Sequence, residues 1–269
     1  MNVVCVGDCG VDRYLPLGQD RAGGITLNFA AHARRLFQPE DRVIVISALG
    51  NDAESDIVTT AVNGLGVESH LVAMAGATSI QTIDLEPSGE KIFVNYEQGV
   101  LGDYRVEERE QALIAEADLL MAPHYRQIEG FFDSVMQSPS RGLRAVDFAD
   151  VAENPSPANV ERYIDRFDVA FVGLSPAHAG LIEQLHRLAA NAGKLVIVTL
   201  GAHGSEALSK RGRFHCPAAA VDKVIDTTGA GDTFAAGFLR EYCVSTDIVE
   251  SLRQGAAQAA KTIQQIGAF

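Results

Sequence analysis

Short apolar runs alternate along the chain with longer stretches in which apolar residues recur every three or four positions. The short runs predict strands, and the longer stretches predict amphipathic helices. The expected strands cover residues 2–6, 43–49, 118–122, 144–148, 168–173 and 194–200. The expected helices cover residues 29–37, 129–136, 159–166, 179–191, 234–242 and 247–265. We therefore expect one α/β domain over residues 1–269, with a mostly parallel central sheet between helical layers.

Two segments have the pattern of antiparallel hairpins instead. Residues 78–86 and 91–96 are strand-like, and the turn-forming cluster Pro87-Ser88-Gly89-Glu90 joins them. Residues 206–216 repeat this pattern around a basic turn. Both segments are expected to add antiparallel strands to the alternating pattern.

Residues 221–238 combine an expected short strand, a glycine loop and the start of a helix. The first turn of a helix has free backbone N–H groups and carries the positive end of the helix dipole, so it attracts anions. Gly229 and Gly231 have no side chains that would keep a phosphate away from these groups. The loop therefore predicts a phosphate site at a helix N-terminus.

Asp232 lies beside this predicted anion site, where a carboxylate would repel a bound phosphate. It is either a favourable charge at a helix start or the base that accepts a hydroxyl proton during phosphoryl transfer. A Walker loop does not fit, because Gly193-Lys194 is followed by Leu195. A Rossmann fingerprint does not fit either, because Phe234 stands where it requires Gly or Ala.

The loop resembles the signature D-T-x-G-A-G-D-x-F of the ribokinase-like (PfkB) family of carbohydrate kinases. The matching residues are Asp226, Thr227, Gly229, Ala230, Gly231, Asp232 and Phe234. The resemblance implies a ribokinase-like three-layer α/β/α fold with a small β lid, and phosphoryl transfer from ATP with Mg²⁺. It also implies that Asp232 is the catalytic base and that the N–H groups of Gly229, Ala230 and Gly231 hold the transferring phosphate. A requirement for a monovalent cation is left open.

Asp8 and Asp12 follow the first expected strand, at the end where ligands bind in open α/β sheets. The alternative is that they are acids of a surface turn. Gly23, Gly24 and Asn28 match the G-G-x-x-x-N with which the family opens its first helix. The resemblance implies that Asp12 and Asn28 bind sugar hydroxyls, that the glycines let the sugar approach, and that Asp8 is a neighbouring candidate. Carboxylate and amide groups suit hydroxyl ligands.

The resemblance also locates the nucleotide and the lid. A T-x-G-x-x-G segment of the family is matched at 199–204, next to the second expected hairpin. The expected nucleotide-binding residues are Thr199, Gly201, Gly204 and Thr228. Lid segments are expected near 12–24 and 77–100, where the family's antiparallel strands cover the sugar and often pair with another subunit. The implied partners are thus a sugar, ATP and a second copy of the chain in a homodimer.

Two family features are absent. Residues 174–179 contain no acid where the family has N-x-x-E, and the D-x-N-x-R segment keeps only its first residue, Asp147. The metal ligands are therefore left unassigned, with Asp147 and Asp150 as alternatives. A catalytically silent sensor of sugar or nucleotide is a second interpretation, although a sensor has no reason to keep Asp232.

Within the family, the closest likeness is to fructoselysine 6-kinases. It rests on the N-terminal Gly-Asp-x-x-x-Asp and on residues 96–100, 147–150 and 259–264. We therefore expect ATP-dependent phosphorylation of the 6-hydroxyl of a fructosamine such as fructoselysine. Ribose, 2-keto-3-deoxygluconate and adenosine are the alternative acceptors.

The composition of the chain further limits the kinds of partner that it is expected to bind. A formal net charge of −13 over 269 residues argues against nucleic acid and anionic membranes. ATP would then be held by backbone N–H groups and Mg²⁺ rather than by a basic surface. No apolar run is long enough to span a membrane and no signal segment is recognisable, so the cytoplasm is expected. Four cysteines without a C-x-x-C pair are expected to be small buried residues.

Overall fold

The computed structural model describes residues 1–86, 88, 90–150 and 156–269. Its large sheet has the strand order β13-β12-β11-β10-β9-β8-β1-β4-β5. In this order, all neighbouring strands between β11 and β5 pair in parallel. Strand β12 pairs antiparallel with β11 on one side and with β13 on the other. The strands are β1 Asn2–Val6, β4 Arg42–Leu49, β5 Glu68–Ala73, β8 Leu119–Pro123, β9 Leu143–Asp150, β10 Val169–Gly173, β11 Leu195–Thr199, β12 Ser205–Ser209 and β13 Gly212–Cys216. The mostly parallel sheet that the sequence predicts is confirmed.

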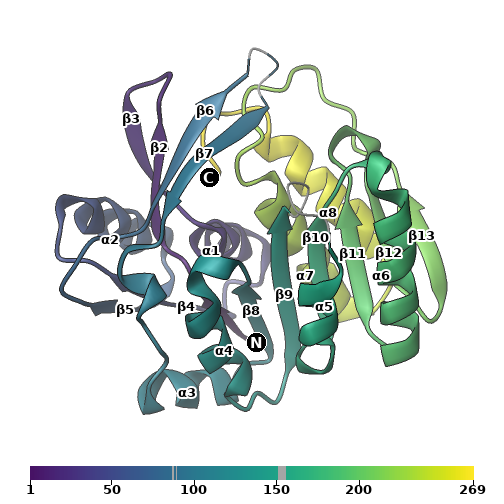
Figure 1. Cartoon of the computed structure of the whole chain (residues 1–269), viewed down its shortest axis with the longest axis horizontal. Coiled ribbons are helices and arrows are strands. Elements are labelled where there is room, and N and C mark those ends of the chain that lie inside the picture. Colours follow the sequence, from purple (N-terminus) through teal and green to yellow (C-terminus); the bar gives the residue numbers. More distant parts are fainter. Residues whose placement is uncertain (87, 89, 151–155) are drawn as a thin grey trace.

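Helices cover both faces of this sheet (Figure 1). One face carries α1 Ile25–Leu36, α2 Ala53–Leu65, α7 Ala230–Ser245 and α8 Ile248–Thr262. The other face carries α3 Glu108–Ala115, α4 Glu129–Gln137, α5 Ala158–Arg162 and α6 Ala179–Ala192. Along β4, Ile44 and Ile46 belong to one core and Val43 and Val45 to the other. Strands buried on both faces explain the continuous apolar runs in the sequence.

A second, small sheet has the strand order β3-β2-β6-β7. Its strands are β2 Gly10–Tyr14, β3 Gln19–Gly23, β6 Ile80–Leu85 and β7 Lys91–Glu97. Figure 1 shows these strands projecting from one end of the large sheet, on the side where the loop before α7 also runs. The hairpin predicted at 78–96 is confirmed as β6 and β7. The turn residues Pro87 and Gly89 lie outside the described residues.

The strand expected at 221–225, before the glycine loop, is wrong. The segment has no regular secondary structure, and the Ile225 side chain is 36% exposed. Its backbone follows the C-terminal end of α8 instead of a strand, because the N–H of Ile225 donates to the carbonyl oxygen of Ile263 at 2.8 Å. The helix expected at 159–166 is shorter than predicted and ends in a 3₁₀ turn at Ile164–Arg166.

All four cysteines are free, and Cys5, Cys9 and Cys216 are buried. A search of the helices that the structure describes finds none with the length and apolar character needed to cross a bilayer.

Candidate active site

Four carboxylates come together between the small sheet and the carboxyl ends of the parallel strands. Asp8 follows β1, Asp147 lies near the end of β9, Asp232 is in the first turn of α7, and Asp12 comes from β2. Each is at most 7% exposed. Burial raises the pKa of Asp12, Asp147 and Asp232, and the charge of Asp8 raises each of the three further. The fold therefore unites residues that are up to 224 positions apart in the sequence.

The glycine loop is built around Asp226, which is fully buried. Its carboxylate accepts hydrogen bonds from the N–H of Thr228 at 2.8 Å, the N–H of Gly267 at 2.9 Å and the hydroxyl of Tyr14 at 2.8 Å. These bonds join the loop, the C-terminal segment and strand β2. Asp226 thus has a structural role, and Tyr14 is a partner that the sequence did not reveal.

The three residues expected to hold the phosphate have different environments. Gly229 precedes α7 with a left-handed φ of 74°, and a Cβ there would lie 2.3 Å from the Cβ of Ala268. Gly231 lies inside the first turn, and a Cβ there would meet no atom within 4 Å. Open space therefore adjoins the backbone of Gly231 at the positive end of the helix, whereas the N–H of Ala230 donates to the carbonyl oxygen of Thr227 at 3.2 Å. This arrangement suits an anion.

Asp232 is paired with Asn28 across the site. The side-chain amide of Asn28 donates to the Asp232 carboxylate at 2.8 Å. Burial is the largest influence on Asp232 and raises its pKa well above the ordinary value, and the charge of Asp147 raises it further. The Asn28 amide bond and the charge of Lys91 oppose these effects. A buried carboxylate with a raised pKa is the property expected of a general base.

Two buried side-chain oxygens of α1 have no hydrogen-bond partner among the described residues. They are the carbonyl oxygen Oδ1 of Asn28 and the hydroxyl oxygen Oγ1 of Thr26. A buried polar atom without a partner costs about 1–3 kcal/mol, so such atoms at a site are usually filled by a ligand or water. Both oxygens are suited to a sugar hydroxyl.

Asp8 caps the first helix, because its carboxylate accepts from the N–H groups of Ile25 at 3.1 Å and Thr26 at 3.2 Å. Burial raises its pKa, and these bonds work against the rise. Gly24 has a left-handed φ of 99° and packs on the backbone of Asp8. These contacts give Asp8 and Gly24 a structural role, and a direct contact with sugar remains a prediction for both.

Asp12 projects from β2 and makes close contact with Gly23. A Cβ at Gly23 would lie 2.2 Å from a carboxylate oxygen of Asp12, so only glycine leaves room for this acid. Burial raises the pKa of Asp12 to about 7, and the charges of Asp8 and Asp226 contribute. The carboxylate of Asp12 has no hydrogen bond within the described part of the chain, so it is free to bind a hydroxyl.

Three of the four expected nucleotide residues lie at the end of β11 and in the loop after it, and the fourth, Thr228, lies in the glycine loop, where its N–H donates to Asp226 at 2.8 Å. Thr199 ends that strand, and Gly201 and Gly204 follow with left-handed φ values of 56° and 86°. A Cβ at Gly204 would collide with the carbonyl oxygen of Cys216, whereas one at Gly201 would meet no atom within 4 Å. Within the described residues, no hydrogen bond links these three residues to residues 226–232. Their part in nucleotide binding stays a prediction.

Asp147 is the buried acid left without an assigned role by the sequence. Its carboxylate accepts from the N–H of Ala149 at 2.7 Å, and Ala149 has a left-handed φ of 55°, unusual for a residue other than glycine. Burial raises the pKa of Asp147 to about 6. The side chain of Asp150 lies outside the described residues. No group of three or more metal-ligating side chains was found in the part of the chain that the structure describes.

Lys91 of β7 is a site residue that sequence reasoning missed, whereas Tyr96 of the same strand belongs to the segment 96–100 that carries the family likeness. The Tyr96 hydroxyl bonds to that of Tyr125 at 2.8 Å, and the two rings meet edge to face with centroids 5.1 Å apart. The N–H of Lys91 donates to the hydroxyl oxygen of Thr227 in the glycine loop at 3.1 Å. The sequence held one signal for Lys91, since it is the only Lys or Arg between Arg42 and Arg105.

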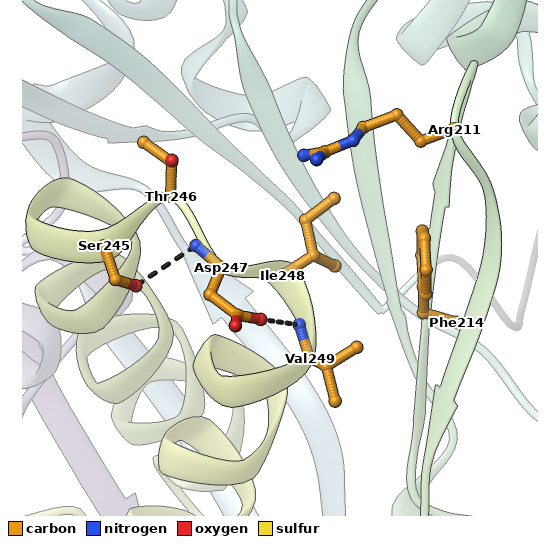
Figure 2. Close-up of a pocket in the computed structure, with 7 residues that line it drawn as sticks. All are labelled: Arg211, Phe214, Ser245, Thr246, Asp247, Ile248 and Val249. Carbon is orange, nitrogen blue, oxygen red and sulfur yellow. Dashed lines mark hydrogen bonds between the residues drawn. The ribbon is translucent and has the colours of Figure 1, made fainter.

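A separate hollow of about 340 Å³ lies at the opposite end of α7 (Figure 2). Ser245 and Thr246, at the C-terminal end of the helix, help to line it. Asp247 caps α8 there by accepting from the N–H of Val249 at 2.9 Å. A helix of 16 residues is about 24 Å long, so this hollow is remote from Asp232. It is not part of the site described above.

Comparisons with known proteins agree with this geometry. Residues 169–269 match the model of the pfkB family carbohydrate kinases. The chain is 30% identical to fructoselysine 6-kinase of Escherichia coli over 266 residues, which are 98% of each chain. It is 30% identical to a fructosamine kinase of Bacillus subtilis over 274 residues, covering 100% of this chain and 93% of the relative.

Solved structures share the fold over its whole length. Ribokinase of Arabidopsis thaliana, complexed with ribose and ATP, superimposes with a TM-score of 0.79 at 20% identity, covering 99% of this chain and 93% of the other. The near-complete relatives and the glycine loop with its buried acid lead to one classification. The chain belongs to the PfkB family of carbohydrate kinases.

Proposed function

We propose that this sugar kinase phosphorylates the 6-hydroxyl of a fructosamine, such as fructoselysine, with ATP. The observation that carries the proposal is the identity of 30% to a fructoselysine 6-kinase and to a fructosamine kinase over nearly the whole chain. The site supports it, because buried carboxylate and amide groups face the glycine loop from β2 and α1. Such groups suit an acceptor rich in hydroxyls.

In the proposed reaction, Asp12 and Asn28 hold hydroxyls of the sugar and bring the acceptor to Asp232. The acceptor oxygen attacks the terminal phosphorus of ATP while its proton passes to the Asp232 carboxylate, and the bond to the ADP oxygen breaks. The N–H of Gly231, which adjoins open space, binds a phosphoryl oxygen as charge shifts toward the leaving group. Asn28, bonded to Asp232 at 2.8 Å, keeps the base turned toward the acceptor.

Mg²⁺ fits this site in the manner usual for kinases. Proteins commonly bind Mg²⁺ with one or two carboxylates together with phosphates of the substrate. Asp147 is the acid that would hold it, since Asp232 serves as the base and Asp8 caps α1. The ion would neutralise charge on the phosphates. The missing acid at 174–179 is then no obstacle, because a site shared with phosphates needs few protein ligands.

We further propose that the small sheet acts as a lid. The site carboxylates are buried in this conformation, so the sheet must move away before a sugar can enter. Its hairpin β6–β7 reaches the glycine loop through Thr227, whose hydroxyl also donates to Glu90 at 3.2 Å. Closure excludes water and limits wasteful hydrolysis of ATP.

The acceptor is tested by measuring ADP release with fructoselysine, psicoselysine, ribose, 2-keto-3-deoxygluconate and adenosine in parallel. The proposal expects the highest kcat/KM with fructoselysine or another fructosamine, and a product phosphorylated at carbon 6 by NMR. A highest kcat/KM with ribose, 2-keto-3-deoxygluconate or adenosine would replace the fructosamine assignment. Binding of these compounds without any ADP release would favour the silent sensor.

The role of Asp232 is tested with Asp232→Asn, which keeps the shape of the side chain and an acceptor for the Asn28 amide. We expect kcat to fall about 10²–10⁴-fold, the usual contribution of a general base, while the sugar dissociation constant changes little. Glu241→Gln, at the far end of the same helix, is the matched control. Wild-type turnover in Asp232→Asn would reject the assignment.

A further inference from the structure

Lys91 lies on the face of the small sheet that covers the site. It is paired with Leu85 across the hairpin, and paired residues point to the same side of a sheet. Side chains two positions apart along a strand share a face, so Ile83 is on that side too. The next strand places Tyr14 opposite Ile83, and Asp12 lies two residues before Tyr14. Lys91 therefore shares a face with Asp12 and with Tyr14, the residue bonded to Asp226.

The end of the hairpin is held on the glycine loop at this point. The N–H of Lys91 donates to the hydroxyl oxygen of Thr227 at 3.1 Å, and that hydroxyl donates to Glu90 at 3.2 Å. Thr227 precedes Gly229, where the expected phosphate site begins, by two positions. The backbone of Lys91 is thus fixed beside the loop that receives the phosphate whenever the sheet is closed.

The ammonium group of Lys91 is not used by the protein itself. No salt bridge to it is found among the described residues, and its described contact is with the Phe93 ring, whose centroid is 5.2 Å from Nζ. It is nevertheless close enough to the acids to lower the pKa of Asp12, Asp147 and Asp232. A partly buried cation that faces carboxylates without pairing with one remains available to an anionic ligand.

We propose that Lys91 is a catalytic residue that lid closure delivers to the transferring phosphoryl group. Its ammonium hydrogens bond to phosphoryl oxygens on the side opposite to the glycine loop. The ammonium keeps its proton throughout, because the acceptor proton goes to Asp232 and the departing bond electrons go to ADP. This inference rests on the proposed kinase reaction and adds a residue to it. It also explains how an acidic site tolerates ATP.

The test compares Lys91→Met and Lys91→Arg with wild type. Lys210→Met, on the exposed turn between β12 and β13, removes the same charge elsewhere and is the control. We expect Lys91→Met to lower kcat about 10²–10³-fold, as loss of an oxyanion donor does, with sugar KM changed less than about threefold. Lys91→Arg keeps the charge and should recover most of the activity. Unchanged kcat in Lys91→Met would overturn the proposal.

A comparison of two sugar acceptors distinguishes a role of Lys91 in catalysis from a role in substrate recognition. The fall in kcat should be the same with fructoselysine and with free fructose, because the phosphoryl group is common to both reactions. A loss confined to fructoselysine would instead assign Lys91 to the carboxylate of the amino-acid arm, and would overturn the catalytic role.

A measurement without sugar tests the role of Lys91 independently of which sugar is the acceptor. ADP with aluminium fluoride mimics the phosphoryl group in transfer, and groups that act in the transition state bind such a mimic more tightly than the ground state. Lys91→Met should weaken binding of ADP with aluminium fluoride at least about tenfold while ADP alone binds as in wild type. Equal binding by the two proteins would overturn the proposal even if no tested sugar is phosphorylated.

Discussion

Gly229 and Gly231 lie two positions apart, and each is glycine for its own reason. Gly229 is required by the folded chain, because its φ is 74° and its Cβ would collide with Ala268. Gly231 has ordinary helical surroundings and open space where a side chain would be. Packing therefore does not require glycine at 231, and we expect that a ligand does. A single-residue exchange to Ala separates the two explanations.

We expect Gly231→Ala to fold normally and to lose activity. Alanine favours a helix by up to about 1 kcal/mol over glycine, so the melting temperature should be equal or higher, while the methyl group occupies the space for the phosphate and weakens ATP binding. Gly229→Ala is the matched variant and should lose about 1–2 kcal/mol of stability from its left-handed φ alone. Calorimetry and ATP titration measure both. Tight ATP binding by Gly231→Ala would contradict the phosphate site.

The raised pKa of Asp12 predicts how stability depends on pH. Burial keeps Asp12 protonated in the folded protein up to about pH 7, whereas an unperturbed Asp has a pKa of 3.8. The folded state therefore binds more protons between these values, and the unfolding free energy contributed by Asp12 decreases as the pH rises through this range.

Asp12→Asn isolates this contribution, since asparagine imitates the protonated acid at every pH. The stability advantage of the variant over wild type should be larger at pH 8 than at pH 5 by about 1–3 kcal/mol, measured by denaturant unfolding without ligand. An equal difference at the two pH values would show that burial does not protonate Asp12. The same variant should raise the sugar KM if Asp12 binds hydroxyls.

The sequence predicted which residues form the motif, but it could not predict the separate role of each of them. Asp226 and Asp232 are both acids of one short signature, and only the structure shows the first as fully buried with its carboxylate bonded to the chain. Asp8 likewise is a helix cap. Lys91 was missed because its position depends on the pairing of β6 with β2, which local pattern does not encode.

At the scale of elements, we expect the contact between the hairpin β6–β7 and the glycine loop to govern closure of the proposed lid. Removing Glu90 deletes one hydrogen bond of this contact and leaves the Lys91 N–H bond to Thr227 in place. A hydrogen bond contributes about 0.5–1.5 kcal/mol, so the ratio of closed to open molecules should fall about two- to tenfold. The lid then protects the phosphoryl group from water less completely.

For Glu90→Ala we expect more ATP hydrolysis for each sugar phosphorylated. The rates are obtained from ADP release with and without sugar, together with direct assay of the sugar phosphate. Glu86→Ala is the control on the same hairpin, because the Glu86 side chain bonds to Ser88 and makes no described contact with the glycine loop. If Glu90→Ala keeps the wild-type ratio, the contact does not limit closure.

Helices and strands with a regular pattern of apolar residues could be predicted from the sequence. Segments whose conformation depends on hydrogen bonds to distant parts of the backbone could not. The parallel strands are buried on both faces and so are apolar throughout, which the sequence shows directly. The segment 221–225 has three apolar residues of a strand-like type, but the N–H of Ile225 bonds to the end of α8. Local composition cannot distinguish a strand from a loop that packs on a helix.

At the scale of the whole molecule, the order of strands brings the two ends of the chain together. The Tyr14 hydroxyl bonds to Asp226, the His32 ring bonds to the carbonyl oxygen of Ala268, and Gly267 donates to Asp226. The alternation of strands and helices predicted the layers. It could not predict these hydrogen bonds. The bonds of Tyr14 and His32 join residues more than 200 positions apart, and the bond between Asp226 and Gly267 joins residues 41 positions apart.

The exposed edge of the small sheet predicts how the molecule associates. β7 is the last strand of that sheet, and Ile92, Phe93 and Val94 on it are 43%, 48% and 53% exposed. An apolar edge strand with free backbone groups readily pairs with another chain. We therefore expect a homodimer through the lid, observed by sedimentation as about twice the mass of 28.7 kDa.

Val94→Lys should shift the protein toward monomer, whereas Val244→Lys should not, because Val244 is 69% exposed at the far end of α7. A monomeric wild type, or equal effects of the two lysines, would exclude this edge as the interface.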